Sequence, residues 1–303
     1  MIYIHLYIYM KEEYMVDKIN CLAIEGGGVK GIASGGAFLR LEELGIYRNL
    51  KRISGSSAGA IGAGAIAVGY TAQEIIDVLK CTDFKMFDDD SGGYIRDAFR
   101  LINKYGIAKG DAFFKWYGQI MYRKTENKNV TFKEVYDRFK KELIITGTNV
   151  NKQCTVYFSY KTHPDMPVRQ AVRISMSIPF FYVPVLYDGD LYVDGGVYQN
   201  YPINVFNVNG KSNPKAIGVL LVSDQEIKQE ELDTGNIAKF GMAIVNGMLN
   251  QLSMKHISSQ YWNQTIRVNT FDISATNFSI TDEQKDLLVK SGYDSVNDWL
   301  KRQ

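Results

Sequence analysis

The amino-acid sequence predicts a single α/β domain with a mostly parallel central sheet. Short apolar runs that suit buried strands alternate along the chain with longer segments in which apolar residues recur at helical spacing. No repeat, low-complexity stretch or Pro-rich linker divides the 303 residues. Because 46% of the residues are apolar, the chain can bury one sizeable core.

The first two structural units each combine a strand, a turn and a helix. Residues 20–24 form an apolar strand that runs into glycines, and apolar residues then recur at helical spacing over residues 29–44, where Gly45 ends the helix. Residues 52–54 form the next strand, and residues 58–68 form a helix of small uncharged residues. Such a helix can lie almost flat on a sheet.

Capping signals place most of the remaining helices. Thr71, Thr131 and Thr281 each stand three residues before a Glu or Gln, which is the pattern of a capping box. Further helices are expected from about Asp111 and over residues 237–252. The remaining strands are predicted over residues 143–148, 154–160, 191–193, 216–222 and 265–268.

Residues 81–129 are less regular and are interpreted as a lid or a specificity insert. They contain the acidic run Asp88-Asp89-Asp90 and a Ser-Gly-Gly. The run lacks the Gly and the distal Glu of a calcium loop, so we expect a solvated loop there.

Composition limits the classes of partner. The chain has 35 basic and 33 acidic residues, which argues against a nucleic-acid partner and makes any lipid contact mainly apolar. Its three cysteines, Cys21, Cys81 and Cys154, are widely spaced and odd in number, which favours a reducing compartment and argues against a zinc site. We therefore expect no metal and a cytoplasmic location.

Residues 1–19 are expected to be an N-terminal extension, with the domain covering residues 20–303. The apolar start lacks a basic region and a small-residue cleavage site, so it does not resemble a signal peptide. The uncharged run over residues 53–73 is long enough to span a bilayer, but its Ser and Gly content favours a buried helix. No transmembrane segment is predicted.

The stretch Gly55-Ser56-Ser57-Ala58-Gly59 is the sharpest functional signal. It has the G-x-S-x-G pattern of a nucleophile elbow, in which a serine stands on a tight turn between a strand and a helix. Gly55 and Gly59 would leave room where a Cβ would clash, and Ser57 Oγ would stand at the helix N-terminus. The alternative is a flexible Gly-Ser turn before a core helix.

A second glycine stretch, Gly26-Gly27-Gly28-Val29-Lys30-Gly31, allows two interpretations. It matches the G-x-G-x-x-G of dinucleotide-binding proteins, but the acidic residue expected at the end of the next strand is absent, and the Lys-Ser/Thr of a Walker A loop is also missing. In a hydrolase, the N–H groups of Gly26, Gly27 and Gly28 would form an oxyanion hole, where a Cβ on Gly28 would crowd the oxyanion. Lys30 would orient this loop or add charge, or would simply be solvated.

A carboxylate follows in Val193-Asp194-Gly195-Gly196. Asp194 comes directly after a predicted strand, at the position where α/β active sites gather, and Gly195 and Gly196 allow a close approach to a neighbouring strand. Asp188, in Asp188-Gly189, is instead interpreted as part of a hairpin turn.

With these three stretches in order, the sequence resembles the patatin-like phospholipase family. A further stretch, Arg173-Ile-Ser-Met-Ser-Ile-Pro179, is similar to one that such domains carry, and the resemblance runs from about Asn20 to about Lys215. It implies a three-layer fold with a mostly parallel central sheet flanked by helices. It also implies Ser57 as nucleophile, Asp194 as general base and the loop from Gly26 to Gly28 as oxyanion hole, without a cofactor.

The activity implied by the resemblance is release of fatty acids from phospholipids or related glycerolipids, through an acyl-enzyme and at a peripheral membrane surface. Two alternatives remain open: a non-catalytic lipid-binding regulatory domain of the same fold, and a nucleotide-dependent oxidoreductase. The histidines are His5, His163 and His256. Although Ser57, Asp194 and His256 follow the order of a conventional triad, we expect catalysis by a Ser-Asp dyad without histidine.

Overall fold

The computed structural model describes residues 18–87, 101, 104–222, 240, 241, 243, 244, 247, 260–275 and 277–303. The predicted extension therefore lies almost entirely outside the described residues. So do Asp88-Asp89-Asp90 and most of the helix expected over residues 237–252.

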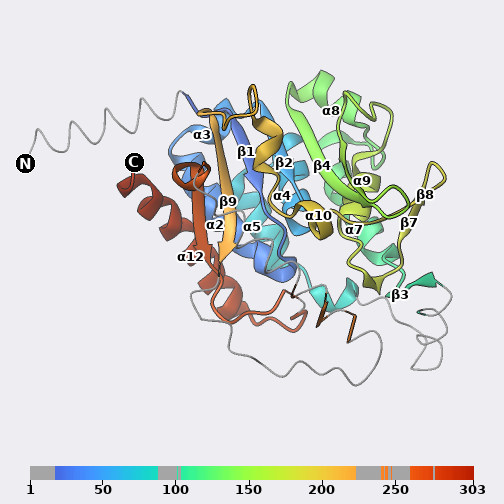
Figure 1. Cartoon of the computed structure of the whole chain (residues 1–303). Helices are drawn as coiled ribbons and strands as arrows, with labels where there is room; N and C mark the ends of the chain where they lie inside the picture. The colour runs from blue at the N-terminus through green and yellow to red at the C-terminus, as the bar shows by residue number, and fades with distance from the viewer. Residues whose placement is uncertain are drawn as a thin grey trace, which may run out of the picture.

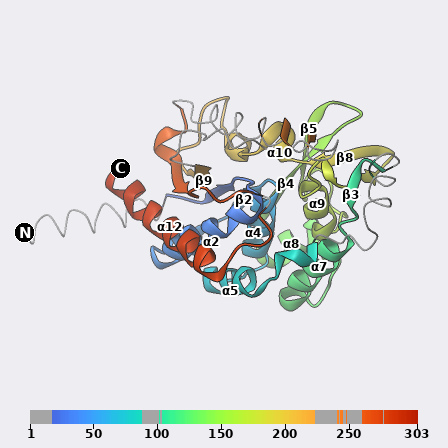
Figure 2. The same cartoon turned by 90° about the horizontal axis from the view of Figure 1, so that it is seen from below.

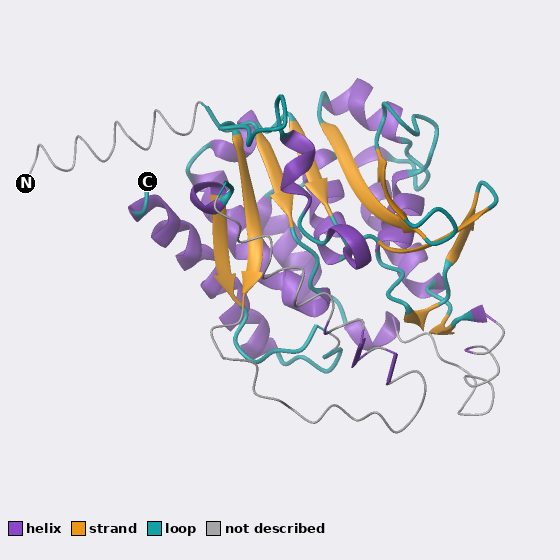
Figure 3. Cartoon of the chain, in the orientation of Figure 1, coloured by secondary structure: helices purple, strands orange, loops and turns teal. Residues whose placement is uncertain are grey.

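The central sheet is mixed but mostly parallel, and it confirms the predicted α/β class. Its strands lie in the order β10-β9-β1-β2-β4-β8-β7, and β5 also pairs with β4. The first five strands of this order are parallel to one another, and β5, β7 and β8 join antiparallel. The arrowheads of β1, β2 and β9 point to the same edge of the sheet in Figure 3. The strands are β1 (Cys21–Ile24), β2 (Arg52–Gly55), β4 (Glu142–Asn149), β5 (Cys154–Phe158), β7 (Val185–Tyr187), β8 (Asp190–Asp194), β9 (Ala216–Val222) and β10 (Thr265–Asn269).

Side chains alternate between the two faces of the sheet, as the pleat requires. In β1, Leu22 and Ile24 join the larger core, whereas Cys21 and Ala23 join a smaller one with Tyr201. Figure 2 shows α2, α4, α5 and α12 on one face and α10 on the other. The helices are α2 (Ile32–Glu43), α3 (Ile46–Asn49), α4 (Ala58–Ala67), α5 (Ala72–Cys81), α7 (Asp111–Thr125), α8 (Phe132–Phe139), α9 (Val168–Ser175), α10 (Gly196–Gln199) and α12 (Asp282–Lys301), with short 3-10 helices η1 (Gly28–Gly31), η2 (Phe84–Phe87), η3 (Pro202–Phe206) and η4 (Trp262–Gln264).

The capping and stop signals in the sequence predict several helix ends correctly. Thr71, Thr131 and Thr281 each form both hydrogen bonds of a capping box, at the starts of α5, α8 and α12. Gly45, with φ 77°, follows the end of α2 as expected. Asp188 and Gly189, with φ 49° and 81°, form the predicted hairpin turn between β7 and β8.

Among the elements that were not predicted, α9, β3 and β6 carry weak local signals. The N-cap of α9 is Pro167, which offers no side-chain hydrogen bond, so nothing marks the start of the helix. The strands β3 (Gly106–Ala108) and β6 (Phe180–Tyr182) are three residues each and, among the residues that the structure describes, pair only with one another. Such short pairings depend on tertiary contacts rather than on a repeated pattern.

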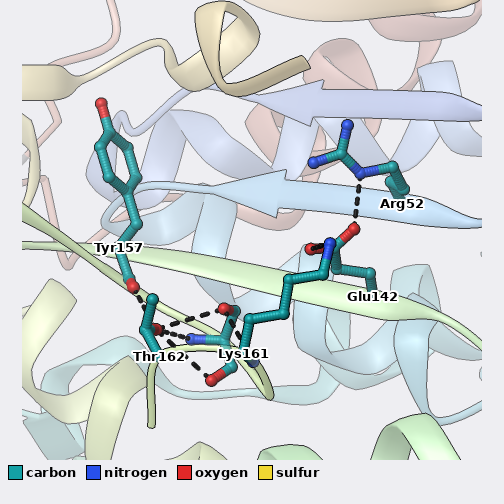
Figure 4. A network of polar contacts seen from close by, with 6 residues as sticks. Arg52, Glu142, Tyr157, Lys161 and Thr162 are labelled. Carbon is teal, nitrogen blue, oxygen red and sulfur yellow. Dashed lines mark hydrogen bonds and ion pairs between the residues drawn. The ribbon is translucent and has the colours of Figure 1, made fainter.

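Charged side chains tie together the amino ends of β2 and β4. Arg52 Nε lies 2.6 Å from Glu142 Oε2, and Lys161 Nζ lies 2.8 Å from Glu142 Oε1 (Figure 4). In the same network, Thr162 Oγ1 donates to the Tyr157 carbonyl at 2.7 Å. Of these contacts, the Arg52–Glu142 ion pair joins β2 to β4, between residues that face each other at the edge opposite to the carboxyl ends of the two strands.

Helix α12 packs on α2 at reciprocal glycines. A Cβ added to Gly36 would meet the Val289 carbonyl, and one added to Gly292 would meet the Ala33 carbonyl. The backbones of α2 and α12 therefore touch, which brings the C-terminal helix onto the first helix of the domain (Figure 1).

We predict that Gly292→Ala lowers the free energy of unfolding by about 3 kcal/mol, because the new methyl group would push α12 away from the Ala33 carbonyl. Urea denaturation followed by circular dichroism measures this. The control is Lys290→Ala on the exposed side of α12, where we expect a change below about 0.5 kcal/mol. Equal stabilities for the two variants would contradict the close packing.

Candidate active site

Ser57 stands at the turn between β2 and α4, where an elbow serine was expected. Its backbone has φ 49° and ψ −126°, and the residue is only 6% exposed. A positive φ in a non-glycine residue costs on the order of 1–3 kcal/mol and persists only where neighbours hold it. A Cβ on Gly55 would meet the Gly59 backbone, and one on Gly59 would meet the Ile24 carbonyl. Both glycines of the motif thus allow backbone contact.

Asp194 is the last residue of β8 and lies directly against Ser57. Ser57 Oγ donates to Asp194 Oδ2 at 2.7 Å, and the Gly196 N–H donates to Asp194 Oδ1 at 2.7 Å. A Cβ on Gly195 would lie 2.5 Å from the Thr146 carbonyl oxygen, so this position also needs glycine. The structure therefore brings the two sequence-predicted residues into contact.

The reason for this meeting differs from the one expected. Asp194 does not end a parallel strand, because β8 runs antiparallel to β4 and Asp194 pairs with Gly147. Gly55 pairs with Ile145 on the other side of β4, so Ser57, two residues later, reaches the level of Gly147. The candidate nucleophile and the carboxylate thus lie on opposite sides of β4, both at the level of Gly147.

Burial raises the pKa of Asp194 to about 7. The Ser57 hydroxyl and the Gly196 N–H oppose this rise because both hydrogen bonds favour the ionised carboxylate. A carboxylate with a pKa near 7 accepts a proton far better than one at the ordinary value of about 4.

The glycine loop lies beside Ser57. The Gly26 N–H donates to the Asn200 carbonyl at 3.2 Å, and Asn200 Nδ2 donates to the Gly26 carbonyl at 3.2 Å. A Cβ on Gly26 would lie 2.7 Å from the Ser57 Cβ. In the described part of the chain, the N–H groups of Gly27 and Gly28 donate no hydrogen bond. These two backbone donors therefore have no partner within the described part of the chain.

The expectation that a Cβ on Gly28 would crowd the oxyanion is wrong. Gly28 has φ 56°, and its Cβ would meet the carbonyl of Ala275. The same carbonyl accepts the Val29 N–H at 3.0 Å. Gly28 is therefore glycine because of its backbone conformation and its contact with residue 275.

Lys30 is half-buried in η1, at the end of this loop. Burial lowers the pKa of Lys30, and the nearby Glu25 carboxylate opposes that change. The side chain is thus partly withdrawn from solvent, next to an acidic group.

We predict that Gly28→Ala lowers the free energy of unfolding by roughly 2 kcal/mol or more and also reduces ester hydrolysis, because the loop must move away from Ala275. Gly189→Ala is the matched control: Gly189 also has a positive φ, 81°, but nothing lies within 4 Å of its Cβ. If the denaturation curves of the two variants coincide, the contact with Ala275 does not contribute to the cost of Gly28→Ala.

The stretch over residues 173–179 lies next to Ser57 and Asp194. Arg173 Nη2 donates to the carbonyls of Lys109 and Val183 at 2.6 and 3.0 Å, and its Nη1 donates to Ser177 Oγ at 2.5 Å. Sequence reasoning used this stretch only for the resemblance. It missed Asn200 altogether, since no local pattern marks a residue that binds a loop so distant in sequence.

His163 packs edge-on against Phe158, with ring centroids 4.8 Å apart. Burial lowers the pKa of its imidazole, and Asp188 opposes that change. None of the contacts among the described residues joins His163 to Ser57 or Asp194. His5 and His256 lie outside the described residues.

The described residues lack two features that would point to other functions. They contain no group of three or more His, Cys, Asp and Glu side chains placed to hold a metal ion. Nor do they contain a helix with the length and apolar character needed to cross a membrane.

Comparison with known proteins agrees with this arrangement. The family model of the patatin-like phospholipases matches residues 22–207. Protein R571 of Acanthamoeba polyphaga mimivirus is 35% identical over 291 residues, which cover 92% of this chain and 93% of that protein. The probable lipid hydrolase 463L of Invertebrate iridescent virus 6 is 30% identical over 201 residues, covering 64% of this chain and 66% of that protein.

The fold matches a solved structure as well. VipD from Legionella pneumophila superimposes with a TM-score of 0.68 and 20% identity, over 94% of this chain and 67% of that one. Fold and sequence together define an α/β protein with a serine elbow facing a buried carboxylate. The chain belongs to the patatin-like phospholipase family. Membership supports lipid hydrolysis as the general class of activity.

Proposed function

We propose that this protein is a lipid acyl hydrolase, of the phospholipase A or lysophospholipase type, that works through Ser57 and Asp194. The observation that carries the proposal is the 2.7 Å hydrogen bond from the Ser57 hydroxyl to the buried Asp194 carboxylate. Residues 20–303 would act as one catalytic unit, in line with the packing of α12 on α2.

In the proposed reaction, Ser57 Oγ attacks the carbonyl carbon of an acyl ester while its proton passes to Asp194 Oδ2. The oxyanion that forms accepts hydrogen bonds from the Gly27 and Gly28 N–H groups, and Lys30 adds positive charge nearby. Collapse of this intermediate breaks the ester bond, and the leaving alcohol takes the proton from Asp194. A water molecule then gives a proton to Asp194 and attacks the carbonyl carbon of the acyl-enzyme. Collapse of this second intermediate breaks the bond to Ser57 Oγ, which takes the proton back from Asp194 as the fatty acid leaves.

Apolar surfaces near the site support a lipid substrate. A small cavity beside the glycine loop is lined by Gly28, Ala58 and apolar side chains that include Ile61 and Phe84, so the surroundings of the loop are mainly apolar. Large apolar side chains are also exposed at Met86, Phe180, Phe240 and Ile244. Their exposure supports contact with a membrane surface.

We predict that Ser57→Ala and Asp194→Asn each reduce hydrolysis of a phospholipid by about a thousandfold or more with the fold retained, because each removes one partner of the proton transfer. Asp188→Asn, in the hairpin turn, and His163→Gln are the matched controls and should keep most activity. Mass spectrometry of fatty acids released from a mixed phospholipid extract gives the readout. A thousandfold loss of activity in His256→Gln would show that catalysis uses a triad with His256 and not the dyad.

We also predict a pH profile set by Asp194. The carboxylate must be ionised to accept the Ser57 proton, and its pKa is about 7. With a soluble ester, kcat/KM should therefore fall about tenfold per pH unit well below pH 7 and level off above it. A midpoint near pH 4 would show that the working base is in an ordinary, solvated environment.

The alternative of a lipid-binding regulatory domain has a direct test. A fluorophosphonate forms a covalent bond with an activated serine, so it should label the wild-type protein and leave Ser57→Ala unlabelled. No labelling at Ser57, combined with binding of phospholipid vesicles, would favour the regulatory domain. A nucleotide-dependent oxidoreductase would be detected by titration with a nicotinamide or a flavin.

A further inference from the structure

Two residues of one short segment contact the two halves of the Ser57–Asp194 pair. Ser175, the last residue of α9, is fully buried, and its Oγ accepts the N–H of Ser57 at 2.9 Å. Two residues later, the Ser177 carbonyl accepts the N–H of Asp194 at 2.8 Å. The same backbone stretch therefore sets the position of both residues.

The Ser57 N–H needs such a partner because of its backbone conformation. With φ 49°, Ser57 is the N-cap of α4, yet its side chain makes no capping hydrogen bond and donates to Asp194 instead. An N–H buried at this turn would be unpaired without Ser175 Oγ, and unpaired buried donors are rare because they are costly.

The segment that carries Ser175 is itself held in place. Arg173 joins it to the carbonyls of Lys109 and Val183, and the Ser177 hydroxyl donates back to the Arg173 carbonyl at 2.8 Å. These contacts hold the backbone on both sides of Ser175 in place, so the position of Ser175 next to Ser57 is fixed.

We propose that Ser175 is a positioning residue for the nucleophile: its hydroxyl oxygen holds the Ser57 N–H, so that Ser57 Oγ points at Asp194. The proposal rests on the proposed function of Ser57 and Asp194. Since this contact occupies the Ser57 N–H, that group is not an oxyanion donor, and the oxyanion depends on Gly27 and Gly28.

The test compares Ser175→Ala with Ser54→Ala. Both serines are fully buried, and Ser54 Oγ also makes one hydrogen bond to a backbone group, the Pro202 carbonyl at 3.1 Å. Each variant thus loses one buried hydrogen bond, but only Ser175 contacts Ser57. With a soluble ester, kcat of Ser175→Ala should fall about ten- to a hundredfold with KM within about twofold, whereas Ser54→Ala should keep both within about twofold.

A second readout separates positioning from a loss of stability. Active-site titration with a fluorophosphonate normalises kcat to folded protein. In addition, the Ser57 hydrogen bond lowers the pKa of Asp194, so a loosened Ser57 should shift the midpoint of the pH profile upward in Ser175→Ala only. If Ser175→Ala does not fold, Ser175→Cys keeps a weaker acceptor of similar size and should show the same changes to a smaller degree.

The outcomes are distinct. A normalised kcat and a pH midpoint equal to those of the wild type in the Ser175 variant would overturn the positioning role. Full activity in Ser57→Ala would instead overturn the proposed function, whatever the result at Ser175.

Discussion

The hydrogen bond between Ser57 and the buried Asp194 carboxylate is the constraint on which the rest of the site depends. Asp194 is 1% exposed, and the contacts that favour its charged form are the Ser57 hydroxyl and the Gly196 N–H. Because the folded pKa, about 7, lies above the unfolded value of about 4, the folded state binds this proton more tightly. Stability therefore falls as pH rises from about 4 to about 7, and the ionised carboxylate costs stability above that range.

Close backbone contacts make this hydrogen bond possible. Gly59 lets α4 start against the Ile24 carbonyl, Gly195 lets the chain after β8 touch Thr146, and Gly26 lets the glycine loop reach Ser57. A methyl group at any of these positions would separate two segments that the proposed reaction needs together. These glycines thus serve first to bring the three segments together.

Sequence reasoning succeeded where the signal is local. Capping boxes, the glycine after α2 and the turn at Asp188 follow from hydrogen bonds within a few residues, so their patterns can be read directly. The same reasoning favoured Asp194 over Asp188 because Asp194 follows a strand, and the structure places Asp194 in contact with Ser57 at the end of the antiparallel strand β8.

It failed for contacts between distant residues of which at least one lies outside a recognisable motif. Three such contacts join segments far apart in the chain: Gly28 with Ala275, Asn200 with Gly26, and Ser175 with the N–H of Ser57. The local sequence around one residue of such a pair does not predict which residue is its partner. Short strands such as β3 and β6 fail for the same reason, because their pairing is a tertiary contact.

The register of β4 explains how these distant parts converge. Its amino end is fixed to β2 by Arg52 and Glu142, and from there β4 continues past the last residue of β2. That extra length gives β8 a strand to pair with, and Thr148 Oγ1 donates to the Asp194 carbonyl at 2.9 Å. If β4 slipped by one residue along β2, β8 would move with it because the two strands are paired. Asp194 would then shift relative to Ser57, and the Asp194 side chain would turn to the other face of the sheet. The ion pair at the far edge of the sheet therefore helps to set the geometry of the proposed dyad, although it contacts neither residue.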